Sequence, residues 1–337
     1  MKTPVPEPKP ARLWRRRRSI VAAFAIALVY GVGTYFLFEN VFANGWREGS
    51  VMLTLSFLVG VPAGGAALAV WIADPRGALP GEHGGIGCFV GVAMLVTGVV
   101  LLREGGICVV MAAPIFIPVA YLAAIAGGSL LKRGGARPKA AVLPLLPLLA
   151  VQAEGQADLP VRLETVSDTV VVAAPPDIVW RHLAEVRNIR PDELGWTFAQ
   201  DVAGIPKPLD ARLEGRGVGA VRHVRWGRGI AFGEEIVRWE EERALDWRFR
   251  FAPDSVPADI ERHIRVDGGN LSLEGGGYRL EPLAGGRTRV TLSTRYRVRT
   301  AFNAYCVWWG ERIVGDLHRN VLRVIAGRAE AAAHSRS

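Results

Sequence analysis

The chain has 337 residues, of which 50% are hydrophobic, and its formal net charge is +9. Its mean hydropathy of +0.20 is high for a soluble protein. Long apolar runs occur before about residue 152, and charged residues are dense after about residue 160. This change in composition indicates two structural parts of different class. Residues 1–18 contain seven Lys and Arg residues and one acidic residue, so the positive charge indicates an arm at a membrane surface and excludes a nucleic-acid partner.

The three cysteines, Cys88, Cys108 and Cys306, are far apart in the sequence, and no CxxC pair occurs. This spacing indicates neither a zinc site nor a disulfide framework, and we expect buried thiols that act as small hydrophobic side chains. The chain also lacks HExxH, GxSxG, Walker A and EF-hand patterns. We therefore expect neither a metal nor a cofactor.

The N-terminal half is predicted to be a membrane bundle. Residues 1–18 are rich in proline, end in four arginines and are expected to form a disordered basic arm. Four apolar stretches then predict transmembrane helices at approximately 19–38, 51–72, 86–102 and 107–131. A cleaved signal peptide is the alternative for the first stretch, but further spans follow it and no A-x-A site does. No ionisable residue lies in the apolar cores of these spans, which argues against an ion or proton path.

Basic residues predict the orientation of the spans. The arginine arm and the basic segment 132–139 should both be cytoplasmic, and four spans between them satisfy this rule. The apolar segment 140–151 is short for a span and contains Pro144 and Pro147, so residues 140–160 are predicted to be a connector and linker. If 140–151 did span, the C-terminal domain would lie outside. We expect a multi-pass protein of the cell membrane whose N-terminus and C-terminal domain are cytoplasmic.

The C-terminal half is predicted to contain one sheet. A β-branched strand over 165–174 precedes a proline pair and a helix over 177–186, and a second short helix is expected over 192–198. Further strands, separated by turn signals, are predicted at 220–226, 230–239, 245–251, 271–282 and 288–298. In the last of them, apolar residues and Thr294 alternate with arginines, as in a strand with one buried face.

The segment 300–330 predicts one long amphipathic helix, about 45 Å in length at 1.5 Å per residue. Its apolar residues recur at steps of three and four: Phe302, Tyr305, Cys306, Trp309, Ile313, Leu317, Val321 and Val324. Such a helix needs a concave apolar partner, which twisted antiparallel strands can supply. The predicted fold is therefore an α-helical bundle of about four spans, followed by an α+β domain at 161–330 whose antiparallel sheet wraps around the helix, and a tail at 331–337.

Three segments of this domain carry a family pattern. Residues 169–180, TVVVAAPPDIVW, give a strand, Ala-Pro, an acidic residue and Val-Trp. Glu234, Ile236 and Trp239 resemble the pattern Glu-x-Val-x-x-Trp, with Ile in place of Val. Residues 277–282 and 286–290 resemble the two strands of a hairpin. Over about 162–330 the chain resembles the START/polyketide-cyclase superfamily, also called SRPBCC, here fused to an N-terminal membrane region. The resemblance implies a helix-grip fold and a cavity. Members of that superfamily bind lipids, sterols, polyketides or hormones, and some cyclise or dehydrate a substrate.

The cavity implied by this resemblance would be mostly apolar, with a few polar groups that orient a ligand. The expected ligand-binding residues are aromatic: Trp180, Trp247, Phe249, Tyr278, Tyr296, Tyr305 and Trp309. Trp226 also fits. Plain hydrophobic core is the alternative for each of them.

Catalytic candidates are Glu234, Tyr278 and His263, because a carboxylate, a phenol and an imidazole in a dry pocket can protonate a carbonyl and deprotonate a C–H group. Asp316 and His318 lie off the apolar stripe of the predicted helix, so we expect them on a solvated face.

Three functions stay open from the sequence. The first, and favoured, is membrane-tethered binding of a hydrophobic small molecule or lipid. The second is a polyketide cyclase or dehydratase-like enzyme, and the third is a regulatory or interaction module with a filled core. An empty cavity would argue against the third function, and an acid–base pair inside it would favour the second. The sequence leaves the ligand and the oligomeric state open.

Overall fold

The computed structural model of this chain describes residues 9–42, 53–132, 143–155, 157–258, 260 and 265–335. The chain divides into two compact units: Met1–Arg103 with Val109–Asp158, and Glu104–Cys108 with Leu159–Ser337. Of the predicted basic arm, residues 1–8 lie outside the described residues, whereas the first helix begins at Lys9, inside that arm. Residues 133–142 and His263 also lie outside the described residues.

The N-terminal unit is helical. Its helices are α1 (Lys9–Leu37), η1 (Phe38–Phe42), η4 (Ser56–Gly60), α2 (Val61–Ala73), α3 (Pro80–Val100), α4 (Gly106–Lys132), η5 (Leu143–Leu145) and α6 (Leu146–Glu154). Among the described residues, four helical stretches are long and apolar enough to cross a membrane: Arg18–Phe42, Ser56–Ala73, Pro80–Val100 and Gly106–Lys132. Their number agrees with the four predicted apolar helices.

One buried polar pair lies at the ends of two apolar helices, outside the apolar cores that are predicted to contain no ionisable residue. Helix α3 begins at Pro80 rather than at residue 86, so it includes Glu82 and His83. His83 is buried, and its Nε2 atom lies 2.9 Å from Oδ2 of Asp74, the residue after α2. The Asp74 carboxylate also accepts hydrogen bonds from two backbone N–H groups of the α2–α3 loop. The pair is satisfied within its own unit, so it needs no ion path to explain it.

The predicted connector contains the nine-residue helix α6, with Pro147 in its first turn. Nine residues are too few to cross a bilayer. The Glu154 carboxylate at the end of α6 accepts hydrogen bonds from the backbone nitrogens of Leu55 and Ser56, each at 2.8 Å. Because Leu55 is the N-cap of η4 and Ser56 its first residue, the carboxylate satisfies donors that a helix start leaves open.

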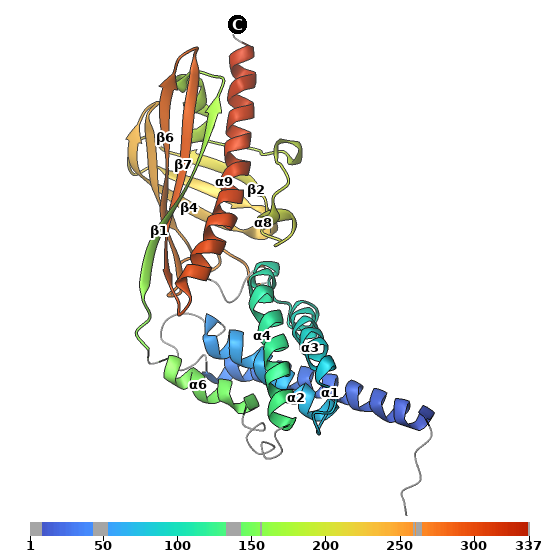
Figure 1. Ribbon diagram of the computed structural model, residues 1–337. Coiled ribbons are helices and arrows are strands. Elements are labelled where there is room, and N and C mark those ends of the chain that lie inside the picture. The colour runs from blue at the N-terminus through green and yellow to red at the C-terminus, as the bar shows by residue number, and fades with distance from the viewer. Residues whose placement is uncertain are drawn as a thin grey trace, which may run out of the picture. The chain divides into compact units, whose positions relative to one another are not determined.

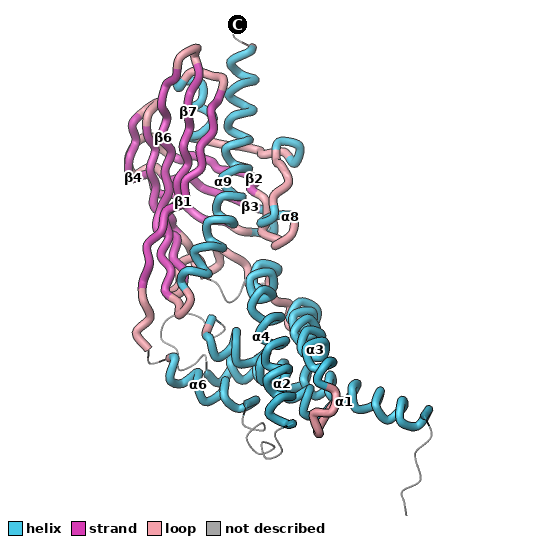
Figure 2. The backbone as a smooth tube through the Cα atoms, in the orientation of Figure 1, coloured by secondary structure: helices cyan, strands magenta, loops and turns pink. Residues whose placement is uncertain are grey.

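The C-terminal unit contains a seven-stranded antiparallel sheet (Figure 2) in the order β1-β7-β6-β5-β4-β3-β2. Its strands are β1 (Val161–Val172), β2 (Pro208–Glu214), β3 (Val221–Trp226), β4 (Ala231–Glu240), β5 (Ala244–Arg250), β6 (Leu271–Leu283) and β7 (Arg287–Arg299). Its helices are α7 (Pro176–Ala184), η6 (Pro191–Glu193), α8 (Phe198–Asp201), η7 (Gly227–Gly229) and α9 (Asn303–His334). The single helix predicted over 192–198 is therefore two short helices, η6 and α8.

Helix α9 packs on the sheet, with β1 and β7 beside it (Figure 1). Every second residue of β7 from Thr288 to Val298 is buried, which gives the strand one apolar face. Gly285 and Gly286, with φ angles of 76° and 66°, form the β6–β7 turn, where glycine adopts the left-handed region at little cost. The arrangement is the helix-grip fold, and it confirms the predicted fold class.

Candidate ligand-binding cavity

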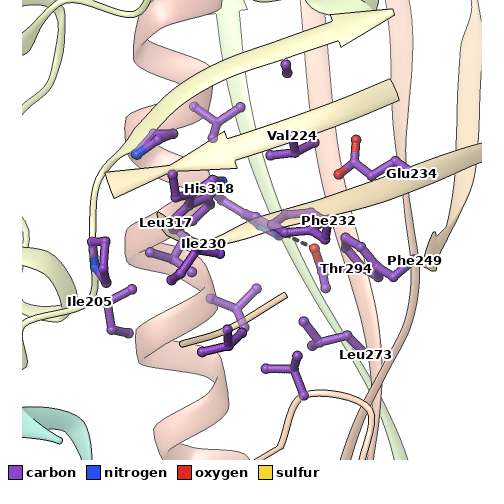
Figure 3. Close-up of a pocket in the computed structure, with 18 of the residues that line it drawn as sticks. Ile205, Val224, Ile230, Phe232, Glu234, Phe249, Leu273, Thr294, Leu317 and His318 are labelled. Carbon is purple, nitrogen blue, oxygen red and sulfur yellow. Dashed lines mark hydrogen bonds between the residues drawn. The ribbon is translucent and has the colours of Figure 1, made fainter. Parts of the chain in front are cut away.

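A cavity of about 320 Å³ lies between the sheet and α9. Its volume is within the range of small-molecule sites, and most of its lining is apolar. Figure 3 shows side chains from the sheet and from α9 pointing into it. The labelled apolar lining residues are Ile205, Val224, Ile230, Phe232, Phe249, Leu273 and Leu317.

Aromatic rings form one wall of the cavity. Phe232 of β4 lies 5.8 Å from Phe249 and 5.4 Å from Phe251, measured between ring centroids. The Trp247 ring lies 6.3 Å from Phe249 and 5.2 Å from Tyr278. Alternation along β5 puts Trp247 and Phe249 on the same face of the sheet, so their rings meet.

Three of the seven predicted ligand-binding aromatics, Trp247, Phe249 and Tyr278, line this cavity, as does Trp226. The other four lie elsewhere in the unit. Trp180 packs in the core, with its ring centroid 5.2 Å from that of Trp239.

The remaining predicted aromatics lie near the N-terminal end of α9. Tyr296 packs in a separate cluster with Val166 and Val298, Tyr305 stacks on Trp308, and Trp309 stacks on Phe198. On α9 the cavity contacts only residues from Ile313 to Val324, so the first turns of the helix do not reach it. Helical periodicity predicts which face is apolar, but not where along that face a space stays open.

A buried ion pair lies on the cavity wall. Arg222 of β3 and Glu234 of β4 are directly opposite in the sheet and are 3% and 6% exposed. Arg222 Nε donates a hydrogen bond to Glu234, and its second nitrogen donates to the Leu183 carbonyl at 2.9 Å. The guanidinium also lies over the Trp247 ring, 4.5 Å from the centroid. Arg222 was not among the predicted site residues, although it occupies an inward position of β3 between Ala220 and Val224.

The structure thereby brings together two of the predicted catalytic candidates, Glu234 and Tyr278, through Arg222. Burial raises the pKa of the Glu234 carboxyl, and the Arg222 charge acts in the opposite direction. Burial raises the pKa of Tyr278 to about 12, so the phenol is neutral at pH 7. The third candidate, His263, lies outside the described residues.

The charged lining residues that the structure describes are all paired. Besides Arg222 and Glu234, Asp210 lines the cavity, and its Oδ2 atom lies 3.0 Å from a guanidinium nitrogen of Arg225. No unpaired cation is therefore found among the described lining residues. Nor does that part of the chain hold a group of three or more His, Cys, Asp and Glu side chains suited to a metal ion.

The expectation that Asp316 and His318 lie on a solvated face is wrong. The two residues are 5% and 4% exposed. Asp316 accepts a hydrogen bond of 2.7 Å from the backbone nitrogen of Ala199 in α8. His318 lines the cavity and is hydrogen-bonded through both ring nitrogens, to Asp168 and to Thr294. Segments distant in sequence cover this side of α9, so the helix is buried beyond its apolar stripe.

One hydrogen-bond donor in the cavity wall lacks an acceptor. Trp247 is 3% exposed, and its Nε1 atom has no hydrogen-bond partner among the described residues. Buried donors in folded proteins nearly always meet an acceptor. The indole N–H of Trp247 is therefore a buried donor that has no acceptor among the described residues.

Comparisons with known proteins give structural similarity at low sequence identity. No protein-family model matches the chain, and no curated protein matches it. The ZhuI aromatase/cyclase from Streptomyces sp. R1128 is 19% identical over 52% of this chain and 96% of its own, with a TM-score of 0.31. Norcoclaurine synthase from Thalictrum flavum, in complex with dopamine and hydroxybenzaldehyde, is 15% identical over 52% of this chain and 90% of its own, with a TM-score of 0.31. At this level of identity, the similarity concerns the fold alone.

Proposed function

We propose that the C-terminal unit binds a neutral, hydrophobic small molecule or lipid between the sheet and α9, and that the four apolar helices hold this unit at a membrane. The observation that carries the proposal is the cavity of about 320 Å³ with its apolar lining and paired charges. A filled-core module is disfavoured by this open space.

Burial of apolar surface supplies enough free energy for such binding. Each buried CH₂ group contributes about 0.8 kcal/mol, so a ten-carbon chain contributes roughly 8 kcal/mol before the costs of association. Aromatic rings along β5 suit planar as well as aliphatic ligands. Affinity for a hydrophobic ligand therefore needs no catalytic group.

The charges of the lining favour a neutral ligand. Arg222 is already neutralised by Glu234, and Asp210 by Arg225. A buried carboxylate without a cationic partner is penalised by several kcal/mol. The cavity should therefore prefer an alcohol, ketone, ester or hydrocarbon over a free fatty acid of the same length.

The membrane part of the proposal rests on the four apolar helices and on the basic residues near their ends. A bilayer concentrates hydrophobic molecules, so a tethered binding domain meets them at high local concentration. The positive charges favour a cytoplasmic N-terminus and a cytoplasmic C-terminal unit.

A cyclase-type role for Glu234 is less well supported than binding. In the described structure this carboxylate is engaged by Arg222, so it is not free to take a proton from a substrate. The enzyme alternative thus needs a different base.

A titration with the uncharged probe N-phenyl-1-naphthylamine tests the binding function, using the full chain in lipid nanodiscs. Val224→Trp fills the cavity from β3, whereas Val237→Trp places the same side chain at a position on β4 that is 43% exposed. We expect saturable fluorescence in the wild type and in Val237→Trp, and a loss of at least about tenfold in affinity in Val224→Trp. Equal titrations in the two variants, with both folded by circular dichroism, would refute binding in this cavity.

A further inference from the structure

Three side chains from three elements form a continuous hydrogen-bonded chain that ends in the cavity. Asp168 Oδ2 lies 2.9 Å from His318 Nδ1, and His318 Nε2 lies 2.8 Å from Thr294 Oγ1. Figure 3 shows the His318–Thr294 hydrogen bond at the cavity wall. Asp168 and Thr294 are diagonal neighbours on adjacent strands, because Asp168 pairs with Leu292 and Thr294 with Val166. The imidazole on α9 bridges them.

The hydrogen bonds assign the donor at each step. The Asp168 carboxylate only accepts, so Nδ1 of His318 carries the proton that it donates to Asp168. Nε2 of the neutral ring then accepts from the Thr294 hydroxyl. Burial lowers the pKa of His318, with Asp168 acting in the opposite direction, and the lowered pKa favours the neutral ring. A hydroxyl bonded to a base that a third group orients is the arrangement of an activated nucleophile.

A second polar group, the indole of Trp247, lies in the same row of the sheet as Thr294. Trp247 of β5, Gly276 of β6 and Thr294 of β7 are paired in one row across the sheet. A Cβ atom at Gly276 would lie 2.5 Å from Cζ2 and 2.7 Å from Cε2 of Trp247. The indole therefore occupies the space over Gly276, on the strand between β5 and β7. Its Nε1–H group, bonded to Cε2, has no acceptor among the described residues.

We propose that Asp168, His318 and Thr294 form a catalytic site that hydrolyses a neutral hydrophobic ester held in the cavity, with Trp247 as donor to the carbonyl oxygen. This activity rests on the proposed function, because the cavity has to bind the ester. A neutral ester suits the paired charges of the lining, and its carbonyl supplies the acceptor that Trp247 lacks.

The reaction needs water and no other co-reactant. Thr294 Oγ1 attacks the ester carbonyl carbon while its proton passes to His318 Nε2, and the oxyanion accepts the Trp247 hydrogen bond. The bond to the leaving alcohol then breaks, and His318 returns the proton to that alcohol. Water next attacks the acyl-threonine and gives one proton to His318. The acyl–Oγ1 bond breaks, and the proton returns to Thr294, which leaves a carboxylic acid and the free enzyme.

Hydrolysis of p-nitrophenyl decanoate by the full chain, with N-phenyl-1-naphthylamine binding measured on the same samples, tests this site. Thr294→Val and His318→Asn should each lower kcat by at least about 100-fold, a loss far larger than any change in their affinity for the probe. Thr294→Ser keeps a hydroxyl and should retain activity within about tenfold. Trp247→Phe should lower kcat by about 100-fold, with a smaller change in KM. Intact mass spectrometry should detect an acyl adduct that is absent from Thr294→Val.

The matched control is Thr291→Val, the same substitution on the outer face of β7, where Thr291 is hydrogen-bonded to Thr169 at 2.9 Å. It should hydrolyse the ester like the wild type. Wild-type protein that binds the probe but releases no p-nitrophenol would overturn the catalytic site and leave the binding function standing. Activity in Thr294→Val equal to that of the wild type would overturn it as well. A wild-type protein that does not bind the probe would instead refute the proposed function.

Discussion

Arg222 and Glu234 set the electrostatics of the cavity as a single cross-strand pair. Both are buried, and each satisfies the other. Removing one partner leaves a buried charge without a counter-ion, which is strongly destabilising. Replacing both partners with apolar side chains leaves no buried charge, so this penalty does not arise. The pair therefore matters more for what the cavity accepts than for net stability.

Glu234→Gln should destabilise the C-terminal unit by about 3 kcal/mol, because Arg222 stays buried without its counter-ion. The measurement is urea unfolding followed by tryptophan fluorescence. The double variant Arg222→Met/Glu234→Leu should lie within about 1.5 kcal/mol of the wild type. A single variant as stable as the double one would contradict the assignment of a buried, mutually dependent pair.

Glycine at position 128 allows α4 to pack against the buried His83. A Cβ atom at Gly128 would lie 1.9 Å from His83 Nδ1, so Gly128→Ala must push the imidazole away from Asp74. We expect a loss of about 2 kcal/mol in stability, measured as a lower melting temperature in detergent. Gly85→Ala on α3 is the control, since no atom lies within 4 Å of its added Cβ, and it should leave the melting temperature unchanged or raise it.

At the scale of elements, the C-terminal part of α9 is fixed by a bidentate ion pair. Arg328 Nε and a second guanidinium nitrogen donate to the two Glu193 carboxylate oxygens at 2.6 and 2.8 Å. Arg328 also donates to the backbone carbonyls of Arg187 and Asn188. Helix α9 is thus attached to the segment that connects α7 to β2, as well as to the sheet.

This ion pair predicts a pH dependence of stability. Arg328 lowers the pKa of Glu193 from 4.5 to about 2. A carboxyl group whose pKa is depressed by folding stabilises the fold above its unfolded pKa, and the contribution is lost as pH falls toward the folded value. Glu193→Gln should therefore cost about 1–2 kcal/mol at pH 7, after allowance for solvent screening. The difference from the wild type in urea unfolding should shrink between pH 4.5 and 2; a constant difference across that range would count against the pair.

The elements of the C-terminal unit were largely predictable, and the partners of their polar residues were not. The period-two pattern of residues 288–298 predicted the apolar face of β7, and the burial of alternate residues confirms it. Ile313, Leu317 and Val321 of the predicted stripe on α9 line the cavity. Asp316 and His318 were placed wrongly because their partners, Ala199, Asp168 and Thr294, come from distant segments. A hydropathy pattern depends on the polarity of each residue. It does not show whether a polar side chain finds a hydrogen-bond partner inside the folded domain.

At the scale of the whole molecule, the second compact unit resumes at Leu159, and the composition of the chain changes near residue 160. The cavity could not be located in the same way. It depends on strand register, on the absence of a side chain at Gly276, and on which turns of α9 the sheet reaches. These are properties of packing, so four of the seven predicted ligand aromatics fell outside the lining.

Native mass spectrometry of the full chain, purified without delipidation, tests most directly the claim that the cavity holds a neutral hydrophobic molecule. Lipids bound to the apolar helices should appear equally in all variants, whereas a ligand of the cavity should depend on Val224. We predict an additional adduct in the wild type and in Val237→Trp that is absent from Val224→Trp and, when released, carries no charge at pH 7. Identical adducts in all three proteins, or a displaced ligand that is anionic, would contradict the account.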